Sequence, residues 1–145
     1  MRQFFEKQKD WEKAADAAKV AASLYPKSDT TNTYYAISLV ILGKTDEARQ
    51  SLKKAVAINS KGIASARVSN QIALALAGAN KLDAGIEWLR IATEIYPKEA
   101  ALYGTFGDYY LKQDLREQAI NAYKKALELD PKFEHAKEML KKLEP

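Results

Sequence analysis

The sequence has no cysteine and only one histidine, His135, in 145 residues. The absence of cysteine excludes disulfide bonds, thiol nucleophiles and zinc sites built on cysteine. His135 lies beside Glu134 and Glu138, and no third partner is evident from the sequence. We therefore interpret His135 as a solvated helix residue rather than as a metal ligand or proton-transfer group, and expect neither a metal site nor a cofactor.

Glycine and proline are also scarce, with six and four residues. The glycines form no phosphate-binding loop, and no serine lies in a nucleophile elbow, so the sequence offers no catalytic residue. No apolar run approaches the ~20 residues that a membrane-spanning helix requires, and no secretory signal is visible. The sequence leaves the cellular compartment open.

Neither sign of charge dominates, since 23 basic and 19 acidic residues give a net charge of +4. Both signs are interspersed along the predicted helices. The lysine pairs at 53–54, 124–125 and 141–142 are interpreted as solvated helix faces, which argues against a nucleic-acid partner.

Residues 100–133 contain a pattern that recurs along the chain. They read as two amphipathic helices joined by a polar turn and closed by Asp130-Pro131, with small residues set between large apolar ones. A shift of 34 residues toward the N-terminus, then 37, then 34, places Ala126 on Ala92, Ala55 and Ala21. The extra three residues fall near 63–65. Because a pair of short helices cannot bury its apolar face alone, the pattern predicts stacked helical repeats.

This pattern resembles the tetratricopeptide repeat (TPR) family. The residues that carry the resemblance in the last copy are Tyr103, Phe106, Gly107, Tyr110, Ala119, Tyr123, Ala126 and Pro131. The earlier copies depart from it at Ser60, Ser69 and Gly85. The resemblance implies an all-α, right-handed α-solenoid of antiparallel helix pairs with a C-terminal capping helix.

The predicted organisation is one domain over residues 1–145. It comprises a partial repeat at 1–28, repeats at 29–62, 66–99 and 100–133, and a capping helix at 134–145. Within the partial repeat, 3–8 would be a remnant of a first helix and Asp10 would cap the second. Thr45, Asn80 and Asp114 are predicted to begin the second helices of the three repeats. The start in mid-repeat suggests a fragment of a longer protein or a natural half-repeat.

The resemblance implies that a protein or peptide partner binds in a groove lined by the first helix of each repeat. The expected groove residues are Tyr34, Ile37, Arg67, Asn70, Gln71, Leu74, Thr105, Asp108 and Lys112. A TPR subclass that grips chaperone C-termini with basic residues and asparagines is disfavoured, because the corresponding positions here lack that set. Trp11 and Trp88 are interpreted as packing residues rather than as anchors for a partner.

The resulting function is that of a protein–protein interaction scaffold. Two alternatives stay open: a C-terminal accessory domain of a larger bacterial protein, with or without enzymatic activity, and a self-associating module that forms homo-oligomers.

Overall fold

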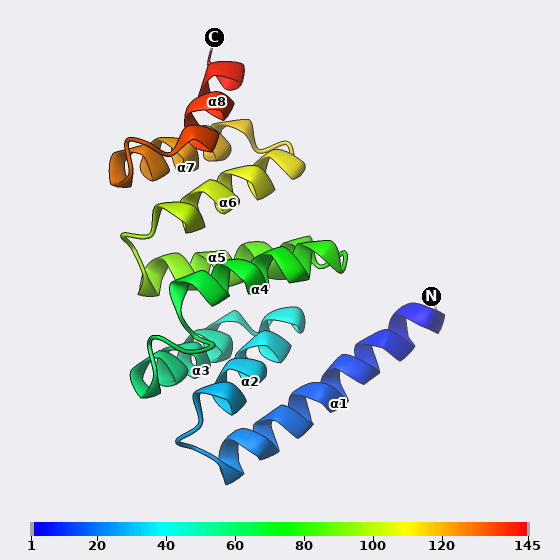
Figure 1. Cartoon of the computed structure of the whole chain (residues 1–145). Helices are drawn as coiled ribbons and strands as arrows, with labels where there is room; N and C mark the ends of the chain where they lie inside the picture. The colour runs from blue at the N-terminus through cyan, green and yellow to red at the C-terminus, as the bar shows by residue number, and fades with distance from the viewer. Residues whose placement is uncertain (1, 145) are drawn as a thin grey trace. The chain divides into compact units, whose positions relative to one another are not determined.

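A computed structural model describes residues 2–144, with side chains from Asp10 onward. Over this range the fold is all-helical and contains no strand (Figure 1). The helices are α1 (Arg2–Leu24), α2 (Asp29–Ile41), α3 (Thr45–Ile58), α4 (Ala66–Gly78), α5 (Leu82–Ile95), α6 (Ala100–Lys112), α7 (Arg116–Leu129) and α8 (Glu134–Leu143). Among these helices, none has the length and apolar character needed to cross a bilayer. The all-α prediction is confirmed.

The chain forms two compact units, one extending to Ser69 and the other beginning at Asn70, so that the division falls inside α4. Each predicted repeat range contains two helices: α2 and α3 lie within 29–62, α4 and α5 within 66–99, and α6 and α7 within 100–133. The three extra residues lengthen the loop before α4, which spans residues 59–65.

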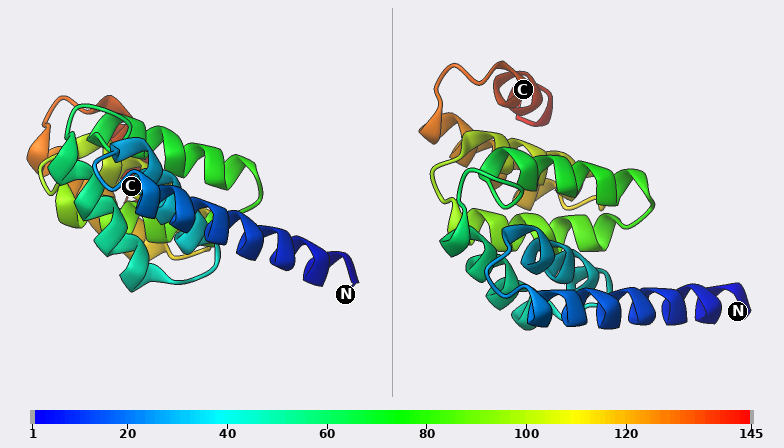
Figure 2. Two further views of the ribbon diagram at one scale, coloured as in Figure 1. Left: turned by 90° about the horizontal axis from the view of Figure 1, so that it is seen from below. Right: turned by 60° about the horizontal axis from the view of Figure 1, so that its bottom comes forward.

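The first helix corrects one prediction. A break was expected before Asp10, but α1 is a continuous helix of 23 residues that extends past the end of α2 (Figures 1 and 2). The physical reason is local: no glycine or proline interrupts residues 2–24, and most of them are good helix formers. The helix ends at Leu24, before Tyr25-Pro26, because the residue preceding a proline is biased away from helical geometry.

In the first unit, α2 packs against both α1 and α3. Small side chains let the helices approach closely: Ala36 of α2 and Ala48 and Ala55 of α3 are fully buried, together with Leu52. Ser51 of α3 donates a hydrogen bond of 2.7 Å to the backbone carbonyl of Asn32, which ties α3 to α2.

In the second unit, small and large residues alternate in the same way where α4 meets α5 and where α6 meets α7. A Cβ added at Gly85 of α5 would lie 3.1 Å from the carbonyl oxygen of Ala73 on α4, so α4 and α5 meet at backbone distance. Gly107 of α6 faces the ring of Tyr123 on α7 in the same way. Trp88 is fully buried, which confirms its interpretation as a packing residue, whereas Trp11 of the first unit is half-buried.

The last helix, α8, packs against α7 through one apolar face. Ala136 is fully buried in a cluster with Ala119, Tyr123 and Ala126, and the other members of this cluster are Tyr103, Tyr110, Leu111, Leu127, Phe133, Met139, Leu140 and Leu143. The ring of Phe133, just before α8, lies against Gly104 of α6. The predicted C-terminal helix is therefore present, and it covers the apolar side of the last repeat.

The turns inside the repeats correct the predicted helix starts. Gly43, Asn80 and Asp114 occupy equivalent places after α2, α4 and α6, and all three have left-handed backbone, with φ of 79°, 60° and 58°. At each turn the next amide bonds back to the preceding helix, as Lys81 N does to the Leu76 carbonyl at 2.8 Å. Asn80 and Asp114 therefore end helices instead of capping new ones. Asparagine and aspartate tolerate this geometry better than most residues other than glycine.

The predicted cap at Thr45 is also one residue late, because Thr45 is the first residue of α3 and Lys44 occupies the cap position. The following helices begin in the same way, with Lys81 and Leu115 at their cap positions. No side-chain capping hydrogen bond is present at these three positions.

Candidate functional site

The predicted ligand-binding face on α4 is largely exposed. Arg67, Gln71 and Leu74 lie four and three residues apart, so they share one side of the helix. Arg67 and Gln71 are exposed, and half of the Leu74 surface is accessible. A partly apolar, solvent-facing stripe of this kind can contact a peptide.

Asn70, which was predicted to belong to the same patch, lies differently. It is half-buried, and its Oδ1 is shielded from solvent without a hydrogen-bond partner among the described residues. The equivalent positions in the other repeats, Thr33 and Gly104, are both buried. This column therefore belongs to the packing between helices.

On α2, the two predicted residues are accessible to different degrees. Tyr34 is 55% exposed, while Ile37 is half-buried on the same side of the helix. Ser38 Oγ donates a hydrogen bond of 3.1 Å to the backbone carbonyl of Tyr34, and this bond does not involve the Tyr34 side chain. Tyr34 therefore presents an aromatic ring and a hydroxyl to solvent.

On α6, the predicted residues are mostly engaged inside the protein. Thr105 is buried, and its hydroxyl donates to the Ala101 carbonyl at 3.1 Å. Lys112 is exposed, with its ammonium nitrogen 5.4 Å from the centre of the Tyr109 ring. Asp108 is bonded to side chains of two other helices, although 39% of its side chain remains accessible.

Asp108, Tyr123 and His135 form a network that the sequence did not predict. The Tyr123 hydroxyl of α7 donates to Asp108 Oδ1, and His135 Nε2 of α8 lies 2.7 Å from the same oxygen. The rings of Tyr123 and His135 meet edge to face, with centroids 5.9 Å apart. His135 is an exposed helix residue, with 46% of its side chain accessible, but it also has a partner in Asp108 that the sequence analysis did not anticipate.

Burial raises the pKa of the Tyr123 phenol well above its usual range, and the hydrogen bond to Asp108 and the carboxylate charge raise it further. A neutral phenol at this position donates to the carboxylate at every physiological pH. The network therefore positions α6, α7 and α8 rather than supplying an acid or base. Among the described residues, no group of three or more acidic, histidine or cysteine side chains is arranged to hold a metal ion.

One signal in the sequence could have revealed the histidine contact. Continuing the 34-residue shift past Ala101 places His135 in the column of Thr30, Arg67 and Ala101, which is one of the predicted groove columns. Treating α8 as the first helix of a further repeat would therefore have placed His135 beside α6.

Comparison with known proteins agrees with the repeat architecture. Two family models described as tetratricopeptide repeat match residues 36–100 and 100–133. No curated protein matches the chain.

Similar solved structures include MamA, with 24% identity, a TM-score of 0.51 and coverage of 90% of this chain and 75% of that one. YrrB, described as a TPR protein with an unusual peptide-binding site, has 22% identity, a TM-score of 0.52 and coverage of 94% and 69%. The first TPR of Spaghetti (RPAP3), bound to the HSP90 peptide SRMEEVD, has 19% identity, a TM-score of 0.54 and coverage of 80% and 90%. At these identities the structures establish the shared fold, and with the two family matches they show that the chain belongs to the tetratricopeptide repeat family.

Proposed function

We propose that this chain is a protein-interaction module that binds a partner peptide or helix on the exposed face of α4. The observation that carries the proposal is the exposure of a large apolar side chain, Leu74, with Arg67 and Gln71 adding polar groups on the same side of the helix. Tyr34 on α2 is a separate exposed aromatic side chain that a partner can contact. Aromatic and arginine side chains are the residue types that most often dominate binding energy at interfaces.

Peptide binding by similar proteins supports this proposal. One of them was solved with an HSP90 peptide and another is described by its peptide-binding site. The positively charged clamp expected for chaperone C-termini is missing here, so we propose a different peptide class. The proposal assigns binding rather than catalysis, since the network at Asp108 joins helices to one another.

The test starts from a peptide selected from a displayed random library against the whole chain. Its dissociation constant is measured by calorimetry for the wild type, for Leu74→Ala with Gln71→Ala, and for a matched control pair at exposed positions outside α4, Ile58→Ala with Gln118→Ala. We expect the α4 pair to weaken binding by about 1–3 kcal/mol and the control pair to leave it unchanged. Selected peptides that bind the α4 variant as tightly as wild type would place the site elsewhere.

A second candidate function, self-association, is favoured by the surface of α1. Ala14 is exposed, and Ala18 and Ala21 are half-buried, whereas the residues in the same columns of α3, α5 and α7 are buried. The same helix and the turn after it leave Val20, Leu24 and Tyr25 57%, 70% and 63% exposed. We propose that this surface pairs with a second copy at high concentration. Light scattering across a concentration series tests this proposal. We expect the wild type to dimerise as its concentration rises and Ala18→Glu to stay monomeric. A wild-type chain that is monomeric at every concentration would refute the proposal.

A further inference from the structure

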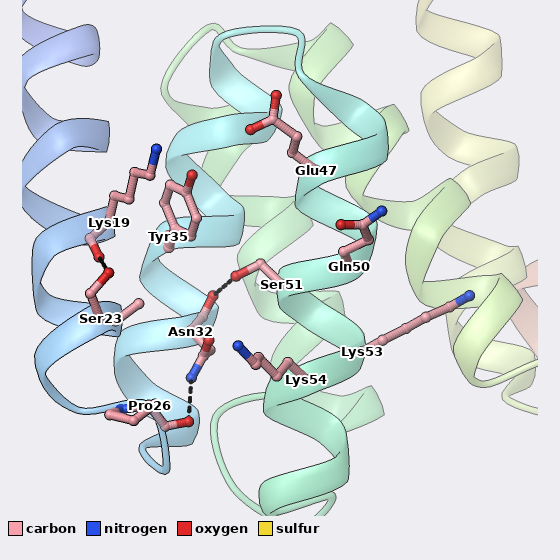
Figure 3. Close-up of a pocket in the computed structure, with 11 residues that line it drawn as sticks. Lys19, Ser23, Pro26, Asn32, Tyr35, Glu47, Gln50, Ser51, Lys53 and Lys54 are labelled. Atoms are coloured by element: carbon pink, nitrogen blue, oxygen red, sulfur yellow. Dashed lines mark hydrogen bonds between the residues drawn. The ribbon is translucent and has the colours of Figure 1, made fainter.

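The first unit contains a cleft on the opposite side of α2 from Tyr34 and Ile37. It has a volume of about 660 Å³, within the range of about 300–1,000 Å³ found for ligand pockets. Its walls are α1 and α3, and α2 forms its floor (Figure 3). Lys19 enters from α1, Lys54 from α3, and Tyr35 lies between them on α2.

The floor of the cleft is held rigidly by internal hydrogen bonds. Asn32 Nδ2 donates to the carbonyl oxygens of Ser28 at 2.8 Å and Pro26 at 3.4 Å, and Ser51 Oγ donates to the Asn32 carbonyl at 2.7 Å. These groups are satisfied within the protein. The hydroxyl of Tyr35 and the amide of Gln50 also line the cleft and have no recorded hydrogen bond among the described residues. They can therefore bond to a ligand.

Charge is unevenly distributed along the cleft. Lys54 and Pro26 lie at one end, Lys19 and Glu47 lie toward the other, and Lys53 points away from the cleft at its rim (Figure 3). Lys19 and Glu47 also line a smaller cleft of about 100 Å³, together with Glu12, Asp16 and Lys44. Among the described residues, Lys19, Lys53 and Lys54 take part in no salt bridge. The Lys54 end is therefore positively charged and uncompensated.

The last repeat contains a smaller cleft, of about 270 Å³, at equivalent positions. Six of its lining residues lie 71 positions after residues that line the first cleft, namely Asn32, Tyr35, Glu47, Gln50, Ser51 and Lys54. There Lys125, the equivalent of Lys54, pairs with Glu128 at 3.3 Å. Arg90, the equivalent of Lys19, pairs with Glu87 at 3.3 Å and lies over the Phe106 ring.

A single residue explains much of this contrast. The position of Glu128 is taken by Ala57 in α3, so Lys54 has no carboxylate one turn further along its helix. Lys54 and Lys125 thus occupy equivalent positions in two repeats, but only Lys125 has a carboxylate partner on its own helix. Lysines left unpaired around a preformed cleft complement negative charge on a ligand.

We propose that the cleft between α1, α2 and α3 binds a short acidic segment of a partner protein, with carboxylate side chains between Lys19 and Lys54. The cleft follows α1 from Lys19 to Ser23, roughly 6 Å at the helical rise of about 1.5 Å per residue, and continues to Pro26 in the turn after α1. About three residues of extended chain fit this length. The site is separate from the exposed face of α4 and does not depend on peptide binding there.

The probe is a fluorescein-labelled hexapeptide of alternating glutamate and serine, and the reference is the same peptide with glutamine in place of glutamate. Fluorescence anisotropy is measured on the whole chain. We expect saturable binding of the acidic peptide, little binding of the glutamine peptide, and weaker binding at 1 M salt, where the screening length falls to about 3 Å.

Three variants locate the binding. Lys19→Gln with Lys54→Gln should weaken it about tenfold, as expected for removing two contacts between exposed opposite charges. The matched control, Arg90→Gln with Lys125→Gln, removes the same charge from equivalent positions and should change binding by less than about twofold. Ala22→Trp blocks the cleft without altering charge and should abolish binding.

Equal losses in the two glutamine pairs would show attraction to the basic surface in general and overturn the proposal. Unchanged binding in Ala22→Trp, equal binding of both peptides, or no saturable binding by the wild type at millimolar peptide would also overturn it. All five substituted positions are exposed or half-buried, and melting curves verify that each variant is folded.

Discussion

The hydroxyl of Tyr123 on α7 donates a hydrogen bond to the carboxylate of Asp108 on α6. His135 of α8, 27 residues further along the chain than Asp108, contacts the same oxygen at 2.7 Å. One carboxylate therefore connects three helices of the last repeat. Because the Tyr123 side chain is fully buried in the intact fold, removing Asp108 deprives its hydroxyl of the acceptor it has there.

Asp108→Ala should lower the free energy of unfolding by about 1–3 kcal/mol, the usual cost of leaving a buried donor unpaired. Asp108→Asn retains an oxygen that can accept from Tyr123 and should cost less. Urea unfolding followed by circular dichroism measures both. The double variant Asp108→Ala with Tyr123→Phe removes acceptor and donor together, so it should lose less free energy of unfolding than the sum of the two single variants. A loss equal to that sum would show that the two residues act independently.

Alkaline pH should destabilise the fold through Tyr123. Its pKa is raised in the folded protein, mainly by burial and then by Asp108, whereas the unfolded phenol titrates near 10. Above about pH 10, Tyr123 loses its phenolic proton in the unfolded state but keeps it in the folded state. The free energy of unfolding, which is constant in this respect below pH 10, therefore decreases as the pH rises toward the folded pKa. Urea unfolding between pH 8 and about pH 11 should show this slope, and Tyr123→Phe should reduce it; an identical slope in the variant would exclude Tyr123 as the cause. Tyr96 and Tyr109, whose pKa values are also raised mainly by burial, supply the remaining slope.

Gly107→Ala should destabilise the last repeat by roughly 1–3 kcal/mol. The added methyl would lie 2.7 Å from Cε1 of Tyr123, whose ring is held by its buried position and its hydrogen bond to Asp108. Gly78→Ala is the matched control, because no atom lies within 4 Å of a Cβ there and alanine favours the helix. Thermal melting of the two variants should therefore move in different directions, and an unchanged melting temperature for Gly107→Ala would contradict the packing described.

Deleting residues 133–145 should expose the apolar side of α6 and α7. The deletion removes the Phe133 ring from Gly104, the His135 contact with Asp108, and the hydrogen bond from Arg116 to the Leu143 carbonyl. Size-exclusion chromatography with light scattering should detect association, together with a lower melting temperature, because large exposed apolar patches promote self-association. Lys141→Ala with Lys142→Ala alters exposed positions of α8 and should leave both properties unchanged. A truncated chain that stays monomeric and equally stable would show that α8 is not needed to cover the last repeat.

The period of the sequence predicted most of the fold because it reflects local geometry. Alanine and glycine recur where two helices touch, as at Ala55, Gly85 and Ala126, and prolines recur where helices end. Helix ends near Ile41, Ile58 and Leu129 follow from the same columns. The errors were also local: Asn80 and Asp114 look like helix caps by composition, and only their positive φ identifies them as the residues that end α4 and α6.

The functional surfaces depended on contacts that no local pattern contains. The sequence by itself determined that α2, α4 and α6 carry the candidate groove columns, since helical periodicity assigns each residue to a face. The tertiary structure decided which of those residues are free: Tyr34 and Leu74 remain exposed, while Asp108 is bonded to Tyr123 and His135. By contrast, the difference between Lys54 and Lys125 is local, because Glu128 lies three residues after Lys125 on the same helix and Ala57 takes that position after Lys54. For the Asp108 network the partners are not local. The physical reason is that a side chain's partners come from helices distant in sequence, and their identities are fixed only when the helices pack together.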